Sequence, residues 1–445
     1  MTSTKHMNFE ADTMNHRSTV RRLLPALGLS LLFSITAVAQ EPTGDELFQK
    51  GRDALFQGNY AAAVELLQQA VATDASGTKT GYRLYLAKAW RYAGKPAAAE
   101  PLLRQILEVS PDHVEAGRSL AEIHAGKEEW QAVLDVLEPL LKYRHDYPIY
   151  HLLAEAAYHL DKTSKARHYY GKAVALNPKS PSDHYQLGNL HLAQNAFAAA
   201  AASYRAALAL GLESPVLHYK LASSYFNLRN YFGRIEQVVV KAGTIHDDRF
   251  LIEPVPGHLD TFLAAPVDSA IYQVTKAIDG GLDDRHDIHV LRANIYLNAR
   301  RFSKALAMFT AIAPKIPEAE QALFCFYHAQ AAFGTGALDD YLRLMGEAIE
   351  RDAKTFGSNL VTAYVKVADQ YNQAGDLDKY IEFLAKAVNG SPRTAALHLK
   401  LGGAYREARR YPEAVVQWRM VLDLQPDHAQ RTELRNRIER HSGAK

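Results

Sequence analysis

The chain has 445 residues, with 51 Lys and Arg residues against 49 Asp and Glu residues, so its formal net charge is only +2. Hydrophobic residues make up 48% and charged residues 22% of the chain, which is a globular composition and not a disordered one. A net charge so near zero argues against a nucleic-acid partner, and a single cysteine excludes an internal disulfide framework and any multi-cysteine metal site. The length allows about three ordinary domains or one extended array.

The amino terminus has the pattern of a secretory signal peptide. Basic residues that include Arg21 and Arg22 precede an uncharged apolar run over residues 23–38, and Ala37 and Ala39 form a small-x-small cleavage site. As a helix this run would span about 24 Å, which is short of the roughly 30 Å hydrocarbon core of a membrane. Signal cores and short membrane anchors overlap in length, so a retained anchor stays open as the alternative.

We expect cleavage after Ala39, which assigns residues 1–39 to the signal peptide and starts the mature protein at Gln40. The translation start can be Met1 or Met14, because Met14 lies just before the basic cluster. The pattern predicts a periplasmic or extracellular protein that contacts a membrane only through this segment, and only if the segment is not cleaved.

From Gly44 onward the chain repeats with a period of about 34 residues. The units that we assign begin at Gly44, Thr80, Val114, Tyr147, Pro181, Pro215, His286, Ala322, Val361 and Ala395. The eighth residue of every unit is small: Gly51, Ala87, Ala121, Ala154, Gly188, Ala222, Ala293, Ala329, Ala368 and Gly402. The twentieth residue is alanine in most units: Ala63, Ala99, Ala166, Ala200, Ala270, Ala305 and Ala414. This regularity predicts paired antiparallel helices, because two helices approach closely only where neither carries a bulky side chain. One pair cannot bury its apolar face, but stacked pairs share a continuous core.

The pattern resembles the tetratricopeptide repeat family over roughly residues 44–428, apart from one interruption. The residues that carry the resemblance best are Leu187, Gly188, Phe197, Ala200, Tyr204 and Ala207, and later Leu401, Gly402, Tyr405, Tyr411, Ala414, Trp418 and Pro426. The resemblance implies an all-α fold, a right-handed superhelical solenoid of about ten helix-turn-helix repeats with one small β-prone insertion. It says little about chemistry, because the same scaffold serves many partners.

The interruption falls between the two helices of the sixth unit. The runs Val238–Val240 and Phe250–Ile252 are β-prone and are separated by turn-forming glycine and proline residues. They predict a small β-hairpin or flap, with an irregular surface excursion as the alternative. The expected organisation is an array over 44–231 (five repeats and the first helix of a sixth), an insertion over 232–266, a second array over 267–428, and a capping helix with a tail over 429–445.

No sequence motif for catalysis, phosphate binding or metal binding stands out. His246, Asp247, Asp248 and His258 lie in the insertion, but they have no recognised metal-ligand spacing, and we interpret them as solvated turn residues. His184, His191, His218 and Cys325 fall on repeat positions that favour core or interface roles over ligand or nucleophile roles. We therefore expect no enzyme activity, no cofactor and no bound metal.

The resemblance implies that partners bind the concave surface, which first-helix residues at positions two, five, nine, twelve and thirteen of each repeat would line. The candidate partner-binding residues are Tyr158, Tyr185, Asn189, Tyr219, Ser223, Asn227, Asn294 and Asn298. Asparagine both donates hydrogen bonds to a peptide backbone and accepts them from it, and tyrosine adds contact area at low entropic cost. This mixture suits an extended peptide or a partner helix, although an ordinary solvated helix surface would look similar.

The sequence thus predicts an exported scaffold that binds a protein or peptide partner in its groove, and no nucleic acid. A component of an envelope assembly for secretion, pilus formation or polysaccharide export is the alternative. An enzyme with a site built by residues 232–266 is the least favoured interpretation.

Overall fold

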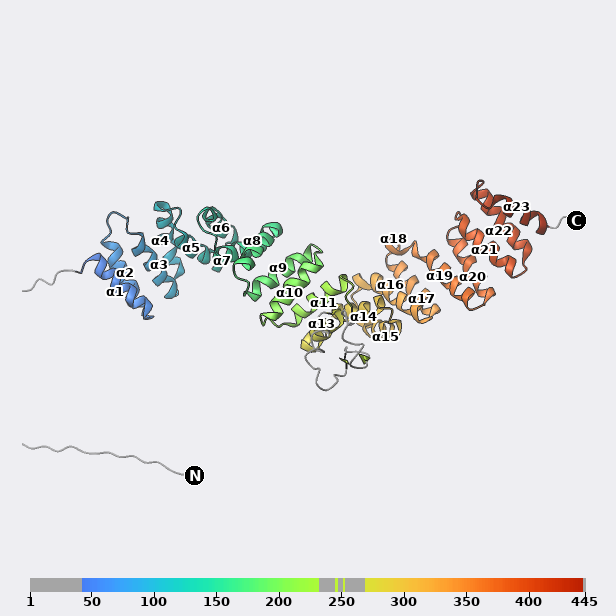
Figure 1. Cartoon of the computed structure of the whole chain (residues 1–445), viewed down its shortest axis with the longest axis horizontal. Helices are drawn as coiled ribbons and strands as arrows, with labels where there is room; N and C mark the ends of the chain where they lie inside the picture. The colour runs from blue at the N-terminus through green and yellow to red at the C-terminus, as the bar shows by residue number, and fades with distance from the viewer. Residues whose placement is uncertain (1–41, 232–244, 247–250, 253–268, 443–445) are drawn as a thin grey trace, which may run out of the picture. The chain divides into compact units, whose positions relative to one another are not determined.

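The computed structural model describes residues 42–231, 245–246, 251–252 and 269–442. Over these residues the fold is all-α, apart from two short strands, and the predicted stack of helical hairpins is confirmed (Figure 1). The chain divides into two compact units, Met1–Ala89 and Trp90–Lys445.

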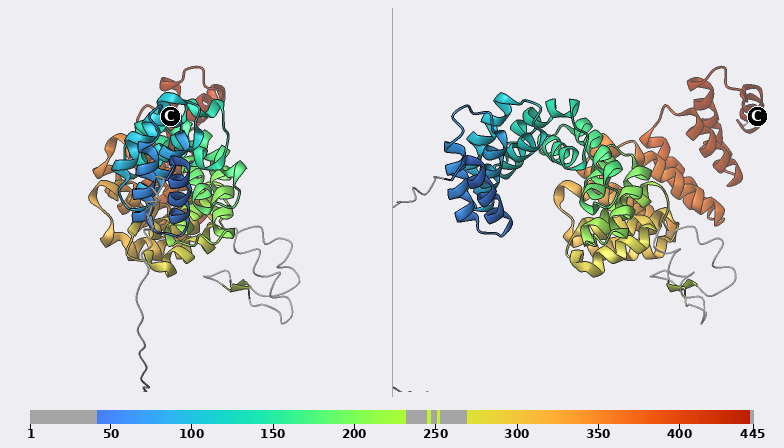
Figure 2. Two further views of the ribbon diagram at one scale, coloured as in Figure 1. Left: turned by 90° about the vertical axis from the view of Figure 1, so that its left-hand side faces the viewer. Right: turned by 60° about the vertical axis from the view of Figure 1, so that its left-hand side comes forward.

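Each repeat that lies whole within one unit is a hairpin of two antiparallel helices. The first helices are α1 (Gly44–Phe56), α3 (Thr80–Tyr92), α5 (Val114–Gly126), α7 (Tyr147–His159), α9 (Pro181–Ala193), α11 (Pro215–Asn227), α14 (His286–Asn298), α16 (Glu318–Thr335), α19 (Asn359–Gln373) and α21 (Ala395–Glu407). The second helices are α2 (Tyr60–Ala72), α4 (Pro96–Val109), α6 (Trp130–Leu137), α8 (Thr163–Leu176), α10 (Phe197–Ala209), α13 (Ala270–Ala277), α15 (Phe302–Ile312), α17 (Leu338–Arg351), α20 (Leu377–Gly390) and α22 (Tyr411–Leu424). Within the second unit each hairpin lies against the next (Figure 2).

The remaining elements are short connections and a final helix. They are the turns η1 (Pro139–Lys142), η3 (Ile278–Leu282) and η4 (Ala313–Lys315), the short helix α18 (Ala353–Phe356), the strands β1 (Ile245–His246) and β2 (Leu251–Ile252), and the last helix α23 (Arg431–His441). Helix α23 packs on α22 and buries Leu434 against Trp418 and Val421.

The small residues at positions eight and twenty lie where the helices cross. All of the alanines at both positions are buried, and so are Gly51, Gly188 and Gly402. The glycines are needed, because a Cβ atom on Gly51 would come within 2.7 Å of the Leu67 side chain. In the eighth and ninth repeats Tyr341 and Tyr380 replace the alanine of position twenty, and both rings are buried in the core.

All of the first helices end in the same way, with the fifteenth residue of the repeat in the left-handed conformation. Glycine takes this position at Gly58, Gly94, Gly336 and Gly375, and other residues take it at Glu128, Asp161, Asn195, Arg229, Arg300 and Arg409. In the seventh repeat the Arg301 amide donates to the Tyr296 carbonyl at 2.8 Å, and the Arg300 amide donates to the Leu297 carbonyl at 3.0 Å. This pair of bonds is the Schellman motif, which satisfies the last carbonyls of a helix.

Replacing Arg300 by glycine is expected to stabilise the chain by about 1 kcal/mol, because a Cβ atom disfavours the left-handed conformation that Arg300 adopts at a φ of 59°. The matched control is Gly375→Ala at a φ of 78°, which should destabilise by a similar amount. Thermal unfolding followed by circular dichroism checks both variants. A loss of stability in Arg300→Gly would show that the arginine side chain contributes more than its backbone strain costs.

The residues that precede the insertion and those that follow it lie next to each other, at the α11–α13 hairpin. The Ala270 amide donates to the Asn230 carbonyl and the Ile271 amide to the Tyr231 carbonyl, both at 3.0 Å. Helices α11 and α13 therefore pack as one hairpin although a long stretch of sequence separates them. Within the insertion, β1 and β2 pair antiparallel, with Ile245 opposite Ile252. The β-prone run Val238–Val240 lies outside the described residues, as does the candidate signal peptide with its cleavage residues.

Candidate binding face

The groove face is the surface made by the first helices α7, α9, α11 and α14 of the second unit at repeat positions five, six, nine, twelve and thirteen. Its members are His151, Glu155, Tyr158, Tyr185, Gln186, Asn189, Tyr219, Lys220, Ser223, Asn227, Asn294 and Asn298. Within each helix they follow one another in steps of one, three or four residues, which places them on one side of the helix. Consecutive first helices contact one another, as α9 does α11, and α11 does α14.

The predicted partner-binding residues differ in their exposure and in their hydrogen bonds on this face. Tyr158, Asn227 and Asn298 are exposed, and the other five are partly buried. The exposed Asn227 side chain donates to the Ser223 carbonyl at 2.8 Å within its own helix. The Asn294 Oδ1 atom is buried and has no hydrogen-bond partner among the described residues.

Three of the predicted residues hold neighbouring repeats together. Asn189 Oδ1 accepts from the Tyr204 hydroxyl at 2.9 Å and from Lys220 Nζ at 2.7 Å. The same ammonium group lies 5.0 Å from the centre of the Tyr185 ring. The Arg285 guanidinium lies 5.1 Å from the centre of the Tyr219 ring, which is a cation–π arrangement. Asn189, Tyr185 and Tyr219 therefore already have partners within the chain.

The bond from Lys220 to Asn189 belongs to a recurring arrangement that we call the lysine ladder. In it the lysine at position six of one repeat bonds to the residue at position nine of the preceding repeat. Its members are Lys220 to Asn189 at 2.7 Å, Lys366 to Gln330 at 3.4 Å and Lys400 to Asp369 at 2.7 Å. The two residues of each pair lie on different repeats, so the pattern within one repeat does not predict the pair.

A histidine–aspartate pair joins α7 to α9. His151 Nδ1 lies 2.7 Å from Asp183 Oδ1, and His151 Nε2 lies 3.6 Å from Glu155 Oε1. Asp183 is fully buried, and its Oδ2 atom has no hydrogen-bond partner among the described residues. The Tyr147 ring stacks on His151, and the Tyr147 hydroxyl bonds to Ser180 Oγ at 3.2 Å. The hydrogen bond that His151 donates to Asp183 raises the pKa of His151, and the negative charge of Glu155 adds to the effect.

The stabilisation from this pair is expected to depend on pH. Because the pKa of His151 is raised in the folded chain, the contribution is complete below the usual value of about 6.5 and is lost as pH rises through the folded value. The charged groups that face His151 are Asp183 on α9 and Glu155 on α7. Between pH 6 and pH 8.5, the melting temperature of the wild type should fall more than that of His151→Gln, which does not titrate. Equal falls in both proteins would contradict the assignment.

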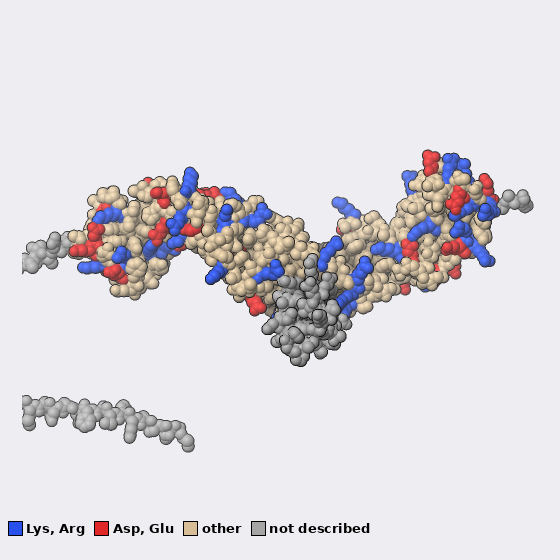
Figure 3. Space-filling view, in the orientation of Figure 1, with Lys and Arg blue, Asp and Glu red and all other residues tan. Residues whose placement is uncertain are grey.

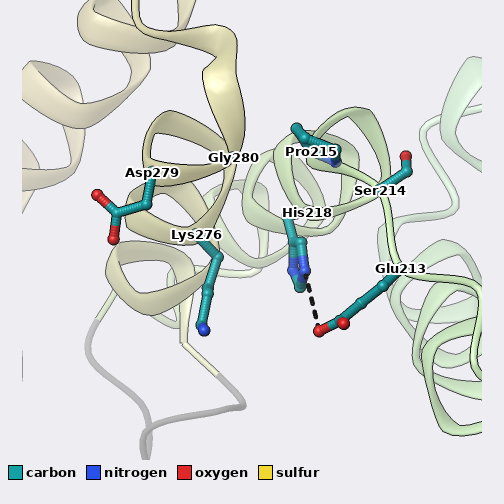
Figure 4. A pocket seen from close by; sticks show the side chains of 7 residues that line it. All are labelled: Glu213, Ser214, Pro215, His218, Lys276, Asp279 and Gly280. Atoms are coloured by element: carbon teal, nitrogen blue, oxygen red, sulfur yellow. Dashed lines mark ion pairs between the residues drawn. The ribbon is translucent and has the colours of Figure 1, made fainter. Parts of the chain in front are cut away.

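A small cavity lies between the start of α11 and the end of α13 (Figure 4). Its volume is about 270 Å³, and Glu213, Ser214, Pro215, His218, Lys276, Asp279 and Gly280 line it. His218 Nδ1 is held by the buried Gln273 at 2.6 Å, and Nε2 lies 3.9 Å from Glu213 Oε1. Figure 4 shows Asp279 directed away from this pair.

Among the described residues, no group of three His, Cys, Asp or Glu side chains is placed to hold a metal ion. Asp247, Asp248 and His258 lie outside the described residues. Cys325 is buried, and burial raises the pKa of its thiol, which disfavours a reactive thiolate.

On the face of the second unit that Figure 3 shows, basic and acidic side chains are interspersed. In the part of the chain that the structure describes, no helix combines the length and the apolar character needed to cross a membrane.

Stacked helical hairpins with small residues at their crossings define a helical-repeat scaffold. Models of the tetratricopeptide repeat family match residues 91–157, 151–215 and 185–231. The chain therefore contains tetratricopeptide repeats over residues 91–231, and such repeats support a scaffold for protein–protein interaction. Arrays of this family are generally not enzymes.

Several solved structures of MamA are similar to part of the chain. MamA from Desulfovibrio magneticus RS-1 is 19% identical, with 38% of this chain and 97% of that chain covered and a TM-score of 0.35. MamA of strain AMB-1 is 20% identical, with 39% and 95% covered and a TM-score of 0.35. No curated protein matches the chain.

Proposed function

We propose that the chain is an exported scaffold that captures an extended peptide segment of a partner protein along the groove face. The observation that carries the proposal is the set of bonds between consecutive first helices, which are the lysine ladder and the pair of His151 with Asp183. These bonds fix neighbouring helices against each other, and a preorganised surface loses less entropy when it binds. Tyr158 and Asn298 remain exposed on this face for a partner.

Site-specific photo-crosslinking tests the groove face directly. A benzoylphenylalanine residue at Tyr158 or Asn298 should give a crosslink to a partner in intact cells. The control position is Val416 on the second helix α22, which is 55% exposed. Crosslinks to the same partner from all three positions, or from position 416 alone, would contradict binding on the groove face.

Export rests on the signal-peptide pattern before Gln40. Amino-terminal sequencing of the exported protein is expected to start at Gln40, which places the scaffold in the periplasm or outside the cell. A protein that retains Met1 or Met14 at its amino terminus would contradict cleavage.

A further inference from the structure

The lysine ladder does not form between α7 and α9, nor at the junctions where position six holds Leu152, Leu291 or Tyr327. In the junctions that form it, an ammonium group from position six reaches the acceptor at position nine of the preceding repeat. Between α7 and α9 the acceptor position holds Glu155, which is a carboxylate, but position six of the following repeat holds Gln186. The Gln186 side chain accepts from Asn189 Nδ2 at 2.9 Å and so bonds within its own helix. A strong acceptor for an ammonium group therefore receives none from the described residues.

The surroundings of Glu155 are negatively charged and open to a partner. Its side chain is 39% exposed, and among the described residues its ion-pair partner is His151 at 3.6 Å, with no lysine or arginine. His151 is shared with Asp183, which is buried and has one carboxylate oxygen unpartnered. Burial raises the pKa of the nearby Tyr170, and the negative charges of Glu155 and Asp183 raise it further. Two carboxylates thus share one histidine.

We propose that Glu155 binds the ammonium group of a lysine side chain carried by the partner, in the place where the ladder lacks its own lysine. The inference rests on the proposed binding of a peptide along the groove face and names the chemistry of one of its side chains. The chain itself shows that the geometry suits an ammonium group, since Lys400 Nζ lies 2.7 Å from the carboxylate of Asp369 at the equivalent junction. The exposed Tyr158 ring, on the same helix, offers an aromatic face to the lysine stem and charge.

A random peptide library displayed on phage tests this pairing with three variants. Gln186→Lys supplies the absent lysine from within the chain, and Glu155→Gln removes the charge of the acceptor. Gln186→Met is the matched control, because it changes the same position without adding an ammonium group. Circular dichroism confirms that each variant is folded before selection. One peptide selected by the wild type is then synthesised with lysine and with norleucine at the enriched position.

The wild type and Gln186→Met should both enrich lysine at one peptide position. In both, the lysine peptide should bind about threefold to fivefold more tightly than the norleucine peptide, which is the size of an exposed ion pair. The ratio should fall to near one in Gln186→Lys and in Glu155→Gln. Selected peptides without lysine enrichment, with arginine in its place, or with an unchanged ratio in both variants would overturn the lysine site and leave groove binding intact. A wild type that selects no peptide would overturn the proposed function as well.

Discussion

Replacing Trp418 by alanine should unfold the last repeat while the rest of the second unit stays folded. Trp418 is fully buried in α22, where it packs with Val421 and with Leu434 of the final helix. Removing a buried tryptophan costs about 3–5 kcal/mol, because both the transfer free energy and the packing around the cavity are lost. A terminal repeat has one neighbour instead of two, so it has the least support against this loss.

Amide hydrogen exchange measures the result helix by helix. Protection should fall in α21, α22 and α23 and remain unchanged in α7 to α11. The control is Val416→Ala on the same helix, which removes an exposed side chain and should change stability by less than about 0.5 kcal/mol. A uniform loss of protection along the second unit would show that its repeats unfold together and would contradict the expectation of local unfolding.

Gly188→Ala is the second substitution with a large expected effect, although it adds a single methyl group. A Cβ atom on Gly188 would lie 2.6 Å from Cε1 of Tyr204, which is far inside contact distance. The ring cannot move away freely, because Tyr204 is fully buried and its hydroxyl donates to Asn189 at 2.9 Å. Overpacking of this kind typically costs 1–3 kcal/mol, of which better helix propensity returns up to about 1 kcal/mol.

The matched control is Gly171→Ala in α8, where no other atom lies within 4 Å of the added Cβ. This variant should be stabilised by about 0.5–1 kcal/mol through helix propensity alone. The two substitutions therefore have opposite expected signs in chemical or thermal unfolding. If both variants changed the free energy of unfolding in the same direction, packing at the helix crossing would not determine the effect of Gly188→Ala.

Local pattern was sufficient to place most of the helices. The first helices α1, α3, α5, α7, α9, α11, α14 and α21 begin at the residues assigned from the repeat alone. Helix α16 instead begins at Glu318, ahead of Ala322 and directly after Pro317. Tyr341 and Tyr380 depart from the alanine that most repeats have at position twenty, yet the core accommodates both rings. The repeat period predicts where two helices cross. It does not predict how large a side chain a particular crossing accommodates.

The left-handed turn at position fifteen was visible in sequence only where glycine occupies it. At Arg300 and Arg409 nothing in the residue type signals that conformation, and the closing hydrogen bonds of the helix impose it. The chemistry of the groove face was still less accessible. Asn189 was a candidate for binding a partner, but the structure shows it bonded to Lys220 and Tyr204. Glu155 falls on a groove position of the repeat in sequence, but nothing there marks its role, because its significance lies in a lysine that the next repeat does not provide.

The sequence by itself determined the repeat, the all-α class, the residues at the helix crossings and the place of the insertion, because all of these depend on spacing within one hairpin. Tertiary structure alone decided which polar residues of the groove face are already bonded and which are open, as Asn189 and Glu155 illustrate. The bond between Lys220 and Asn189 joins two repeats, and its distance is fixed only when one hairpin stacks on the next.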